Sequence, residues 1–176
     1  MNILMPFHLL SRSKTSHSME IIINNYTVYI EDDVLEKLRS FRQTDNNSHE
    51  SGGVLLGKRI KNKNIYYIVD LSKPNKYDSS SRFGFVRNAK AAQRYIKKAW
   101  KNSDGYVNYI GEWHTHPEPC PSPSSTDRNC YITISKEKSS PFQLTINIIY
   151  GNANAFYICG YKDKNMIFER TINEQE

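Results

Sequence analysis

The segment GEWHTHPEPCPSPSSTD, residues 111–127, constrains the fold more than any other part of the chain. It starts as the end of a strand-like run, DGYVNYIGEWHTH, and continues into a loop with prolines at four alternating positions. The pattern Ser-x-x-Asp from Ser124 to Asp127 then has the spacing of a helix start. A strand end, a stiffened loop and a helix N-terminus therefore follow one another here, and the chain can fold back on itself between them.

Two histidines at the end of this predicted strand can bind one metal ion. Side chains alternate along a strand, so His114 and His116 lie on one face and Thr115 lies on the other. A catalytic zinc takes three protein ligands and leaves one position open, and Asp127, eleven residues after His116, can supply the third ligand. The alternative needs no metal, because Ser124 and Asp127 also have the spacing of a capping box. Ser124 can cap the helix and face the site from the same location.

The rest of the chain predicts a single domain of mixed α/β (α+β) type. At 176 residues it is long enough to bury one hydrophobic core, and no internal repeat or linker divides it. The predicted strands cover residues 20–30 (two runs around Asn24-Asn25), 52–60, 64–71, 104–116, 142–151, 154–162 and 165–172. The predicted helices cover residues 31–43, 86–102 and a short segment from about Ser124, and residues 73–85 are predicted to be a loop. These elements indicate a mixed sheet flanked by helices.

The N-terminal residues do not fit this regular pattern. Alternation of apolar and polar residues begins only at Met19. We therefore expect residues 1–18 to be a disordered or non-native tail, residues 19–176 to form the domain, and Met19 to be a candidate start. The apolar run near the N-terminus is broken by Pro6 and has no charged leader, which argues against a secretory signal.

Composition excludes some function classes and weakens others. The net charge of +6 and pI of about 9.1 come from basic residues spread along the chain, which is more typical of a solvated surface than of a nucleic-acid footprint. Nucleic acid is therefore the weaker alternative as a partner. The three cysteines include no Cys-x-x-Cys pair, which favours a reducing cytoplasm over a disulfide-bonded fold. No segment approaches the ~20 apolar residues of a membrane span, so we expect no membrane partner.

Four parts of the sequence, in order, match the signature of a known family. A glutamate, Glu50, stands ahead of a Gly-rich strand in HESGGVLLGKRI, and His114-x-His116 follows. Seven intervening residues lead to Ser124, and two more lead to Asp127. This arrangement resembles the JAMM (MPN-plus) signature of zinc-dependent isopeptidases, and the resemblance extends over roughly residues 30–165.

The resemblance implies a fold and a set of roles. The fold is a single MPN/JAB-like domain with a curved mixed sheet. One Zn²⁺ is bound by His114, His116 and Asp127, and it lowers the pKa of a bound water toward about 7. Glu50 is the general base and then the acid for the leaving amine, and Ser124 stabilises the oxyanion.

The resemblance also implies a substrate, namely a protein conjugated through its C-terminus. The phrases FVRN and GEWHTHP are similar to the deconjugating peptidases of CBASS anti-phage systems. There the conjugated protein is a cyclic-nucleotide synthase, and an E1–E2-like ligase of the same operon forms the bond. An extended substrate tail can add beside a sheet edge, and residues 73–84 are a candidate specificity surface. Two alternatives stay open: a peptidase that processes a ubiquitin-like sulfur carrier, and a metal-free MPN scaffold.

Other polar and aromatic residues near the motifs have simpler interpretations. Glu112 shares the face of His114, and a structural role is favoured over support of a ligand. His49 is expected to point away from the site because it is the neighbour of Glu50 in an extended segment, and Cys120 is expected to be an inert loop thiol. We expect burial for four further residues: Trp100, Trp113, Cys130 and Cys159.

Overall fold

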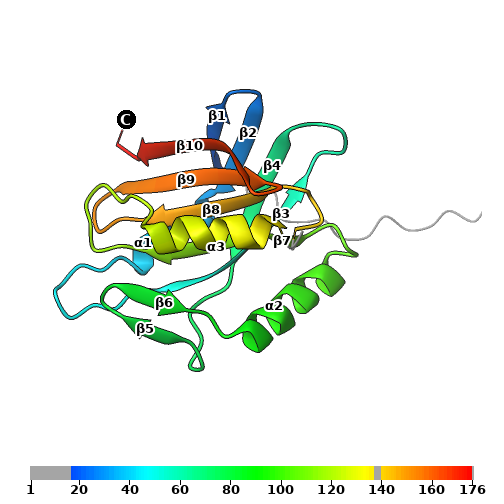
Figure 1. Cartoon of the computed structure of the whole chain (residues 1–176). Helices are drawn as coiled ribbons and strands as arrows, with labels where there is room; N and C mark the ends of the chain where they lie inside the picture. The colour runs from blue at the N-terminus through cyan, green and yellow to red at the C-terminus, as the bar shows by residue number, and fades with distance from the viewer. Residues whose placement is uncertain (1–16, 137–139, 176) are drawn as a thin grey trace, which may run out of the picture.

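The computed structural model describes residues 17–136 and 140–175 and shows one sheet with helices on both faces (Figure 1). The strands of these residues are β1 (Ser18–Ile23), β2 (Tyr26–Glu31), β3 (Gly52–Arg59), β4 (Ile65–Leu71), β5 (Ser79–Ser81), β6 (Gly84–Val86), β7 (Asn108–Thr115), β8 (Thr145–Tyr150), β9 (Ala155–Lys162) and β10 (Asn165–Asn173). The helices are α1 (Asp32–Ser40), α2 (Ala89–Asn102) and α3 (Ser125–Lys136). The predicted α/β domain is confirmed.

Eight strands form one mixed sheet in the order β1-β2-β4-β3-β7-β8-β9-β10. The pairs β2–β4 and β7–β8 are parallel, and the other neighbours are antiparallel. β7 is therefore a central strand, with β3 on one side and β8 on the other. Both of its edges are hydrogen-bonded, which fixes its backbone firmly enough to hold functional side chains.

The core lies on both faces of the sheet. Val34, Leu35 and Leu38 of α1 pack on one face with Trp113 and Ile148, and all five are at most 3% exposed. The opposite face is covered by α2, which packs on β3 and β7, and by α3, which packs on β8 and β9 (Figure 1). The central strands β3, β8 and β9 are therefore buried on both of their faces.

The sheet curls around α1 until its two edge strands meet. Tyr26 of β2 contacts Phe168 of β10 with a ring-centroid distance of 5.6 Å. The guanidinium of Arg170 in β10 donates a hydrogen bond of 3.2 Å to the Ile22 carbonyl oxygen in β1. The expected curved sheet is present, and the curl encloses the apolar face that α1 covers.

The segment predicted as a loop, residues 73–85, contains part of a small hairpin. β5 and β6 pair with the register Ser79↔Val86, Ser80↔Phe85 and Ser81↔Gly84. The prediction was wrong there because three exposed serines carry no apolar alternation that would mark a strand. The hairpin is not a strand pair of the large sheet and forms its own two-stranded sheet (Figure 1).

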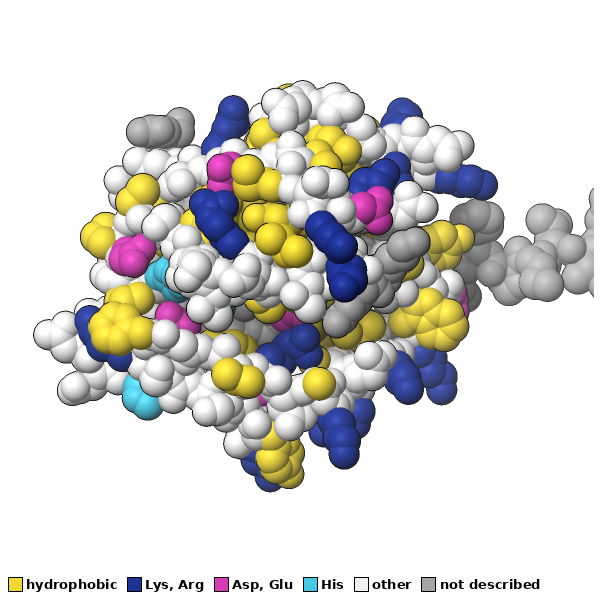
Figure 2. All heavy atoms as spheres, in the orientation of Figure 1, with side chains coloured by type: hydrophobic (Ala, Val, Ile, Leu, Met, Phe, Trp, Pro, Cys, Tyr) yellow, Lys and Arg dark blue, Asp and Glu magenta, His cyan; other side chains and the backbone are white. Residues whose placement is uncertain are grey.

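Helix α2 differs from the prediction in the direction of its tryptophan. Its buried side is formed by Ala92, Tyr95, Ile96 and Ala99, at helical spacings of three, one and three. Trp100 lies one position further round and is 52% exposed, so its expected burial was wrong. The five Lys and Arg residues of α2 are all exposed, and basic side chains are seen over this part of the surface (Figure 2).

The N-terminal expectation falls largely outside the described residues. Of the predicted tail, residues 1–18, the structure describes His17 and Ser18, and Ser18 already pairs with Glu31 as the first residue of β1. No helix within the described ranges is long and apolar enough to cross a membrane.

Candidate active site

The end of strand β7 places two imidazoles on one face, as its alternation predicts. Gly52 of β3 is the antiparallel neighbour of His114, and Ile149 of β8 is its parallel neighbour. The Nε2 atoms of His114 and His116 lie 3.1 Å apart, while Thr115 between them points to the opposite face and is fully buried. Two ring nitrogens therefore face a common point at the carboxyl end of a rigid strand.

The start of α3 returns Asp127 to these histidines. Its Oδ1 atom lies 3.3 Å from His114 Nε2, and its Oδ2 atom lies 3.6 Å from His116 Nε2. The backbone N–H and the hydroxyl of Ser124 both donate to Oδ2 of Asp127, at 2.7 and 2.6 Å, and the Asp127 N–H donates to Ser124 Oγ at 3.2 Å. Ser124 and Asp127 form a capping box, and the same hydrogen bonds orient the Asp127 carboxylate toward the histidines. The motif is therefore compatible both with a helix cap and with a metal ligand.

The three side chains fit a metal ion. Ligand atoms of His114, His116 and Asp127 lie within 4.8 Å of one another, and no other group of this kind occurs among the described residues. Burial would raise the pKa of the Asp127 carboxyl, but the hydrogen bond and charge of His114 hold it well below its usual range. Burial and the neighbouring His114 lower the pKa of His116. A carboxylate and a neutral imidazole are the forms that bind a cation, and two nitrogens with one oxygen match the ligand preference of zinc.

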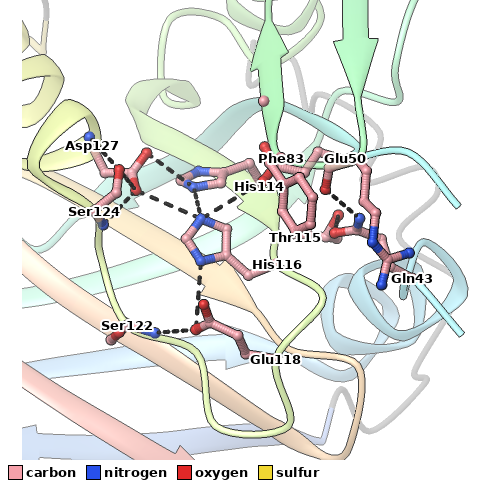
Figure 3. A network of polar contacts seen from close by, with 12 residues as sticks. Gln43, Glu50, Phe83, His114, Thr115, His116, Glu118, Ser122, Ser124 and Asp127 are labelled. Atoms are coloured by element: carbon pink, nitrogen blue, oxygen red, sulfur yellow. Dashed lines mark hydrogen bonds and ion pairs between the residues drawn. The ribbon is translucent and has the colours of Figure 1, made fainter. Parts of the chain in front are cut away.

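Glu50 lies on the other side of the histidines from Asp127 and Ser124 (Figure 3). Its Oε1 atom is 3.9 Å from His116 Nε2, and the residue is 7% exposed. Burial raises the pKa of its carboxyl to about 7, against the charge of His114, which lowers it. A carboxyl of this kind, beside a predicted metal site and with a pKa of about 7, can accept and return a proton. The structure thus brings together all five residues that the sequence singled out.

The two glycines after Glu50 are explained by packing. A Cβ atom on Gly52 would lie 2.5 Å from the Phe85 ring of the hairpin, and one on Gly53 would lie 2.4 Å from Ser72 Oγ. Close packing against the hairpin and against Ser72 therefore requires glycine at both positions. A groove of about 400 Å³ runs between this segment and the hairpin and is lined in part by Glu50 and Phe85.

Glu112, on the same face of β7 as the histidines, forms an ion pair with Arg87. Arg87 donates to both of its carboxylate oxygens at 2.9 Å, and Tyr109 donates to Oε1 at 2.8 Å. Tyr109 reaches it because the register of β7 against β3 shifts at Ile110, which brings Tyr109 onto the face of Glu112. The expected structural role of Glu112 agrees with these contacts.

The remaining predicted residues lie outside the metal group. His49 is exposed next to the buried Glu50. Cys120 is exposed and lines a separate groove with Arg42 and Asn154. Trp113 and Cys159 are buried as expected, whereas Cys130 of α3 is exposed, so its expected burial was wrong.

A comparison with family models decides the family. Residues 31–166 match the model described as prokaryotic homologs of the JAB domain. The chain belongs to this family. The matched range includes every strand from β3 to β9 and all of the site described above.

Relatives of this JAB domain carry a common name. A protein of Escherichia coli (strain TW11681) named CD-NTase/cGAS isopeptidase is 37% identical over 105 residues, which is 60% of this chain and 66% of that protein. A protein of the same name from Vibrio cholerae is 38% identical over 56% of this chain and 62% of its own length. One from Pseudomonas aeruginosa is 30% identical over 77% of this chain and 83% of its own length. The chain thus matches slightly less than two thirds of the first two relatives.

A solved structure shares the fold. The solution structure of protein DSY2949 from Desulfitobacterium hafniense is similar with a TM-score of 0.57 and 19% identity. The similarity covers 80% of this chain and 88% of that one. The JAB domain therefore has the architecture of a known structure along most of its length.

Proposed function

We propose that this JAB domain is a zinc-dependent isopeptidase that releases a protein joined to its target through the C-terminus. The observation that carries the proposal is the convergence of three metal ligands and one buried glutamate. His114, His116 and Asp127 meet within 4.8 Å, and Glu50 faces the same point from the opposite side at 3.9 Å from His116 (Figure 3). A metal-free scaffold would have no need for this set, because Ser124 alone can cap α3.

The chain's own residues supply the proton transfers and the substrate contacts. Zinc, when bound by the two histidines and Asp127, would act as a Lewis acid and activate water for attack on the scissile carbonyl. Glu50 accepts the proton of the attacking water and returns it to the leaving amine, which suits a carboxyl whose pKa is raised to about 7 by burial. The Ser124 hydroxyl, which donates to Asp127 Oδ2 in this structure, would turn from it to donate to the developing oxyanion, while the Ser124 backbone N–H keeps Asp127 Oδ2 bonded.

The substrate we propose is a CD-NTase-like protein conjugated through its C-terminal residue to an amine. The names of three relatives, 30–38% identical to this chain, support that class. The groove beside Glu50 can receive an extended tail between the hairpin and the segment that precedes β3. In a cell, a ligase of the E1–E2 type would form the bond that this enzyme removes.

The test uses zinc-loaded protein and two conjugates that differ only in the protein that is joined through its C-terminus. One is a CD-NTase linked through its C-terminus to a lysine side chain, and the other is a ubiquitin-like sulfur carrier with the same linkage. Release of intact CD-NTase, detected by mass, is the expected result. Cleavage of only the sulfur-carrier conjugate would show that the substrate is a sulfur carrier and not a CD-NTase. If zinc-containing protein cleaves neither conjugate, the peptidase assignment is contradicted.

A further inference from the structure

A buried amide beside the site is fully engaged in hydrogen bonds. Gln43 follows α1 and is 2% exposed. Its Nε2 donates to two backbone carbonyl oxygens, that of Ser48 at 3.1 Å and that of Arg82 at 2.9 Å. Its Oε1 accepts from the Thr115 hydroxyl at 3.3 Å. Two carbonyls on one side and a hydroxyl on the other leave a single orientation for the amide.

Thr115 continues this chain of bonds into the strand that holds the histidines. It lies between His114 and His116, faces away from both, and is fully buried. Its Oγ1 accepts the backbone N–H of Ser51 at 3.0 Å, and its own N–H donates to the Ser51 carbonyl at 2.9 Å. The ligand strand is therefore bonded directly to the residue after Glu50.

These bonds bracket Glu50 on both sides. Ser48, two residues before it, is held through its carbonyl by Gln43, and Ser51, the next residue, is held by Thr115. The N–H of Glu50 itself donates to the Ser81 carbonyl in the hairpin at 2.7 Å, and Gln43 holds the next hairpin residue, Arg82. Figure 3 shows Gln43 and Thr115 beside Glu50 and the two histidines.

We propose that Gln43, acting through Thr115, is the positioning residue that fixes the Glu50 segment and the β5–β6 hairpin against the metal-ligand strand. The inference rests on the proposed function, since a precise place for Glu50 matters only if Glu50 transfers protons. Three segments that are distant in sequence converge on one neutral side chain. The neutral amide does this without a buried charge, whose desolvation would cost far more.

The positioning has a functional consequence. General-base catalysis depends on the distance from the carboxyl to the attacking water, and a displacement of about 1 Å can reduce the rate by about 100-fold. Substrate contacts made elsewhere along the groove do not depend on that distance to the same degree. Loss of the Gln43 bonds should therefore lower kcat much more than it raises KM.

The test combines hydrogen exchange with kinetics on the full, zinc-loaded chain. Gln43→Met removes the three bonds at similar volume, and Thr115→Val removes the hydroxyl alone. Thr115→Ser keeps the hydroxyl and serves as the rescue variant, and Gln93→Met on the exposed face of α2 is the matched control. The Glu50 amide is the reporter, because its N–H donates to the Ser81 carbonyl and not to either altered side chain.

The expected result has two parts. Exchange of the Glu50 and hairpin amides accelerates about fivefold or more in Gln43→Met and Thr115→Val, with unchanged exchange in β8 and β9. In the same variants kcat falls about tenfold or more at unchanged zinc content, while KM changes less than about threefold. Thr115→Ser and Gln93→Met retain wild-type values.

Two results would overturn the proposal. One is wild-type exchange of the Glu50 amide in both Gln43→Met and Thr115→Val. The other is a loss of kcat that merely follows the fraction of unfolded protein. If the wild-type chain cleaves no conjugate, the proposed function fails, and the exchange measurement still decides whether Gln43 holds the Glu50 segment. If Gln43→Met does not fold, the milder Thr115→Val decides.

Discussion

Two polar networks flank strand β7, one fully buried and one partly exposed, and they differ in chemistry and in what they connect. On the face away from the histidines, Gln43 and Thr115 form a neutral chain that joins loops and the hairpin. On the face of the histidines, Arg87 and Glu112 form an ion pair between the segment that precedes α2 and the middle of the strand. Each network includes one residue of β7 that is close in sequence to a predicted zinc ligand. Thr115 is adjacent to His114, and Glu112 precedes His114 by two residues.

The difference in chemistry indicates that the two networks have different roles. A buried ion pair carries a large desolvation cost, and it becomes strongly destabilising when one partner is lost. The Arg87–Glu112 pair therefore stabilises the part of β7 that carries the predicted ligands. Neutral hydrogen bonds are weaker but directional, so the Gln43–Thr115 chain is suited to placing the Glu50 segment. Variants should separate the two, with effects on stability for one and on rate for the other.

The largest effect on rate is expected at Glu50 itself. Glu50→Gln keeps the size of the side chain and removes its ability to accept a proton, so kcat should fall by about 100-fold or more with zinc content unchanged. The residual kcat of this variant is the lower limit with which the kcat values of the Gln43 and Thr115 variants are compared. Single-turnover cleavage measures it, and full activity in Glu50→Gln would remove Glu50 as the base.

The largest effect on stability is expected at Arg87. Arg87→Met leaves the largely buried Glu112 carboxylate with Tyr109 as its remaining donor, and we expect a loss of about 2 kcal/mol in the free energy of unfolding. Glu112→Gln should cost less, because the Arg87 side chain is 29% exposed and can turn to water. Urea unfolding at constant m-value measures both. An equal or reversed order would contradict the role given to this ion pair.

A smaller effect is expected at Asp70, whose network contacts neither of the other two. Lys37 and Tyr95 donate to its two carboxylate oxygens at 2.5 Å. Burial would raise the pKa of Asp70, but the hydrogen bonds from Lys37 and Tyr95 bring it below its ordinary value of 3.8. The stabilisation is therefore present above pH of about 4 and is lost as pH falls toward the folded-state pKa.

Asp70→Asn should cost about 0.5–1 kcal/mol at pH 7, because the pair is partly exposed. The difference from wild type should shrink below pH of about 4, and zinc content and kcat should not change. Urea unfolding across pH gives the first quantity and steady-state cleavage gives the second. A loss of kcat in Asp70→Asn would show that effects on rate are not confined to the Gln43–Thr115 network.

The site could be predicted from the sequence where its geometry is local. Alternation along a strand places His114 and His116 together, and the Ser124–Asp127 spacing defines a helix start. Glu50 lies 64 residues before His114, and only the family resemblance identified it. Gln43 gave no signal, because two of its three partners, Arg82 and Thr115, are 39 and 72 residues away and meet it only in the folded chain.

The fold could likewise be predicted only in part from the sequence. The elements of the large sheet follow from periodicity, whereas the order of strands and the parallel pair β7–β8 depend on tertiary packing. The shift of register at Ile110 breaks the period of two, so the contact of Tyr109 with Glu112 could not be derived from alternation. The hairpin was missed because exposed serines lack a burial pattern.

The most direct test of the zinc site is elemental analysis of the protein purified without added metal. Wild type is compared with Asp127→Ala and with Asp33→Ala, an exposed aspartate in the first turn of α1. We expect about one zinc per chain in wild type and in Asp33→Ala, and its loss in Asp127→Ala. A wild-type chain that takes up no zinc even after reconstitution, or an Asp127→Ala chain that retains it, would contradict the site and leave Ser124 and Asp127 as a helix cap only.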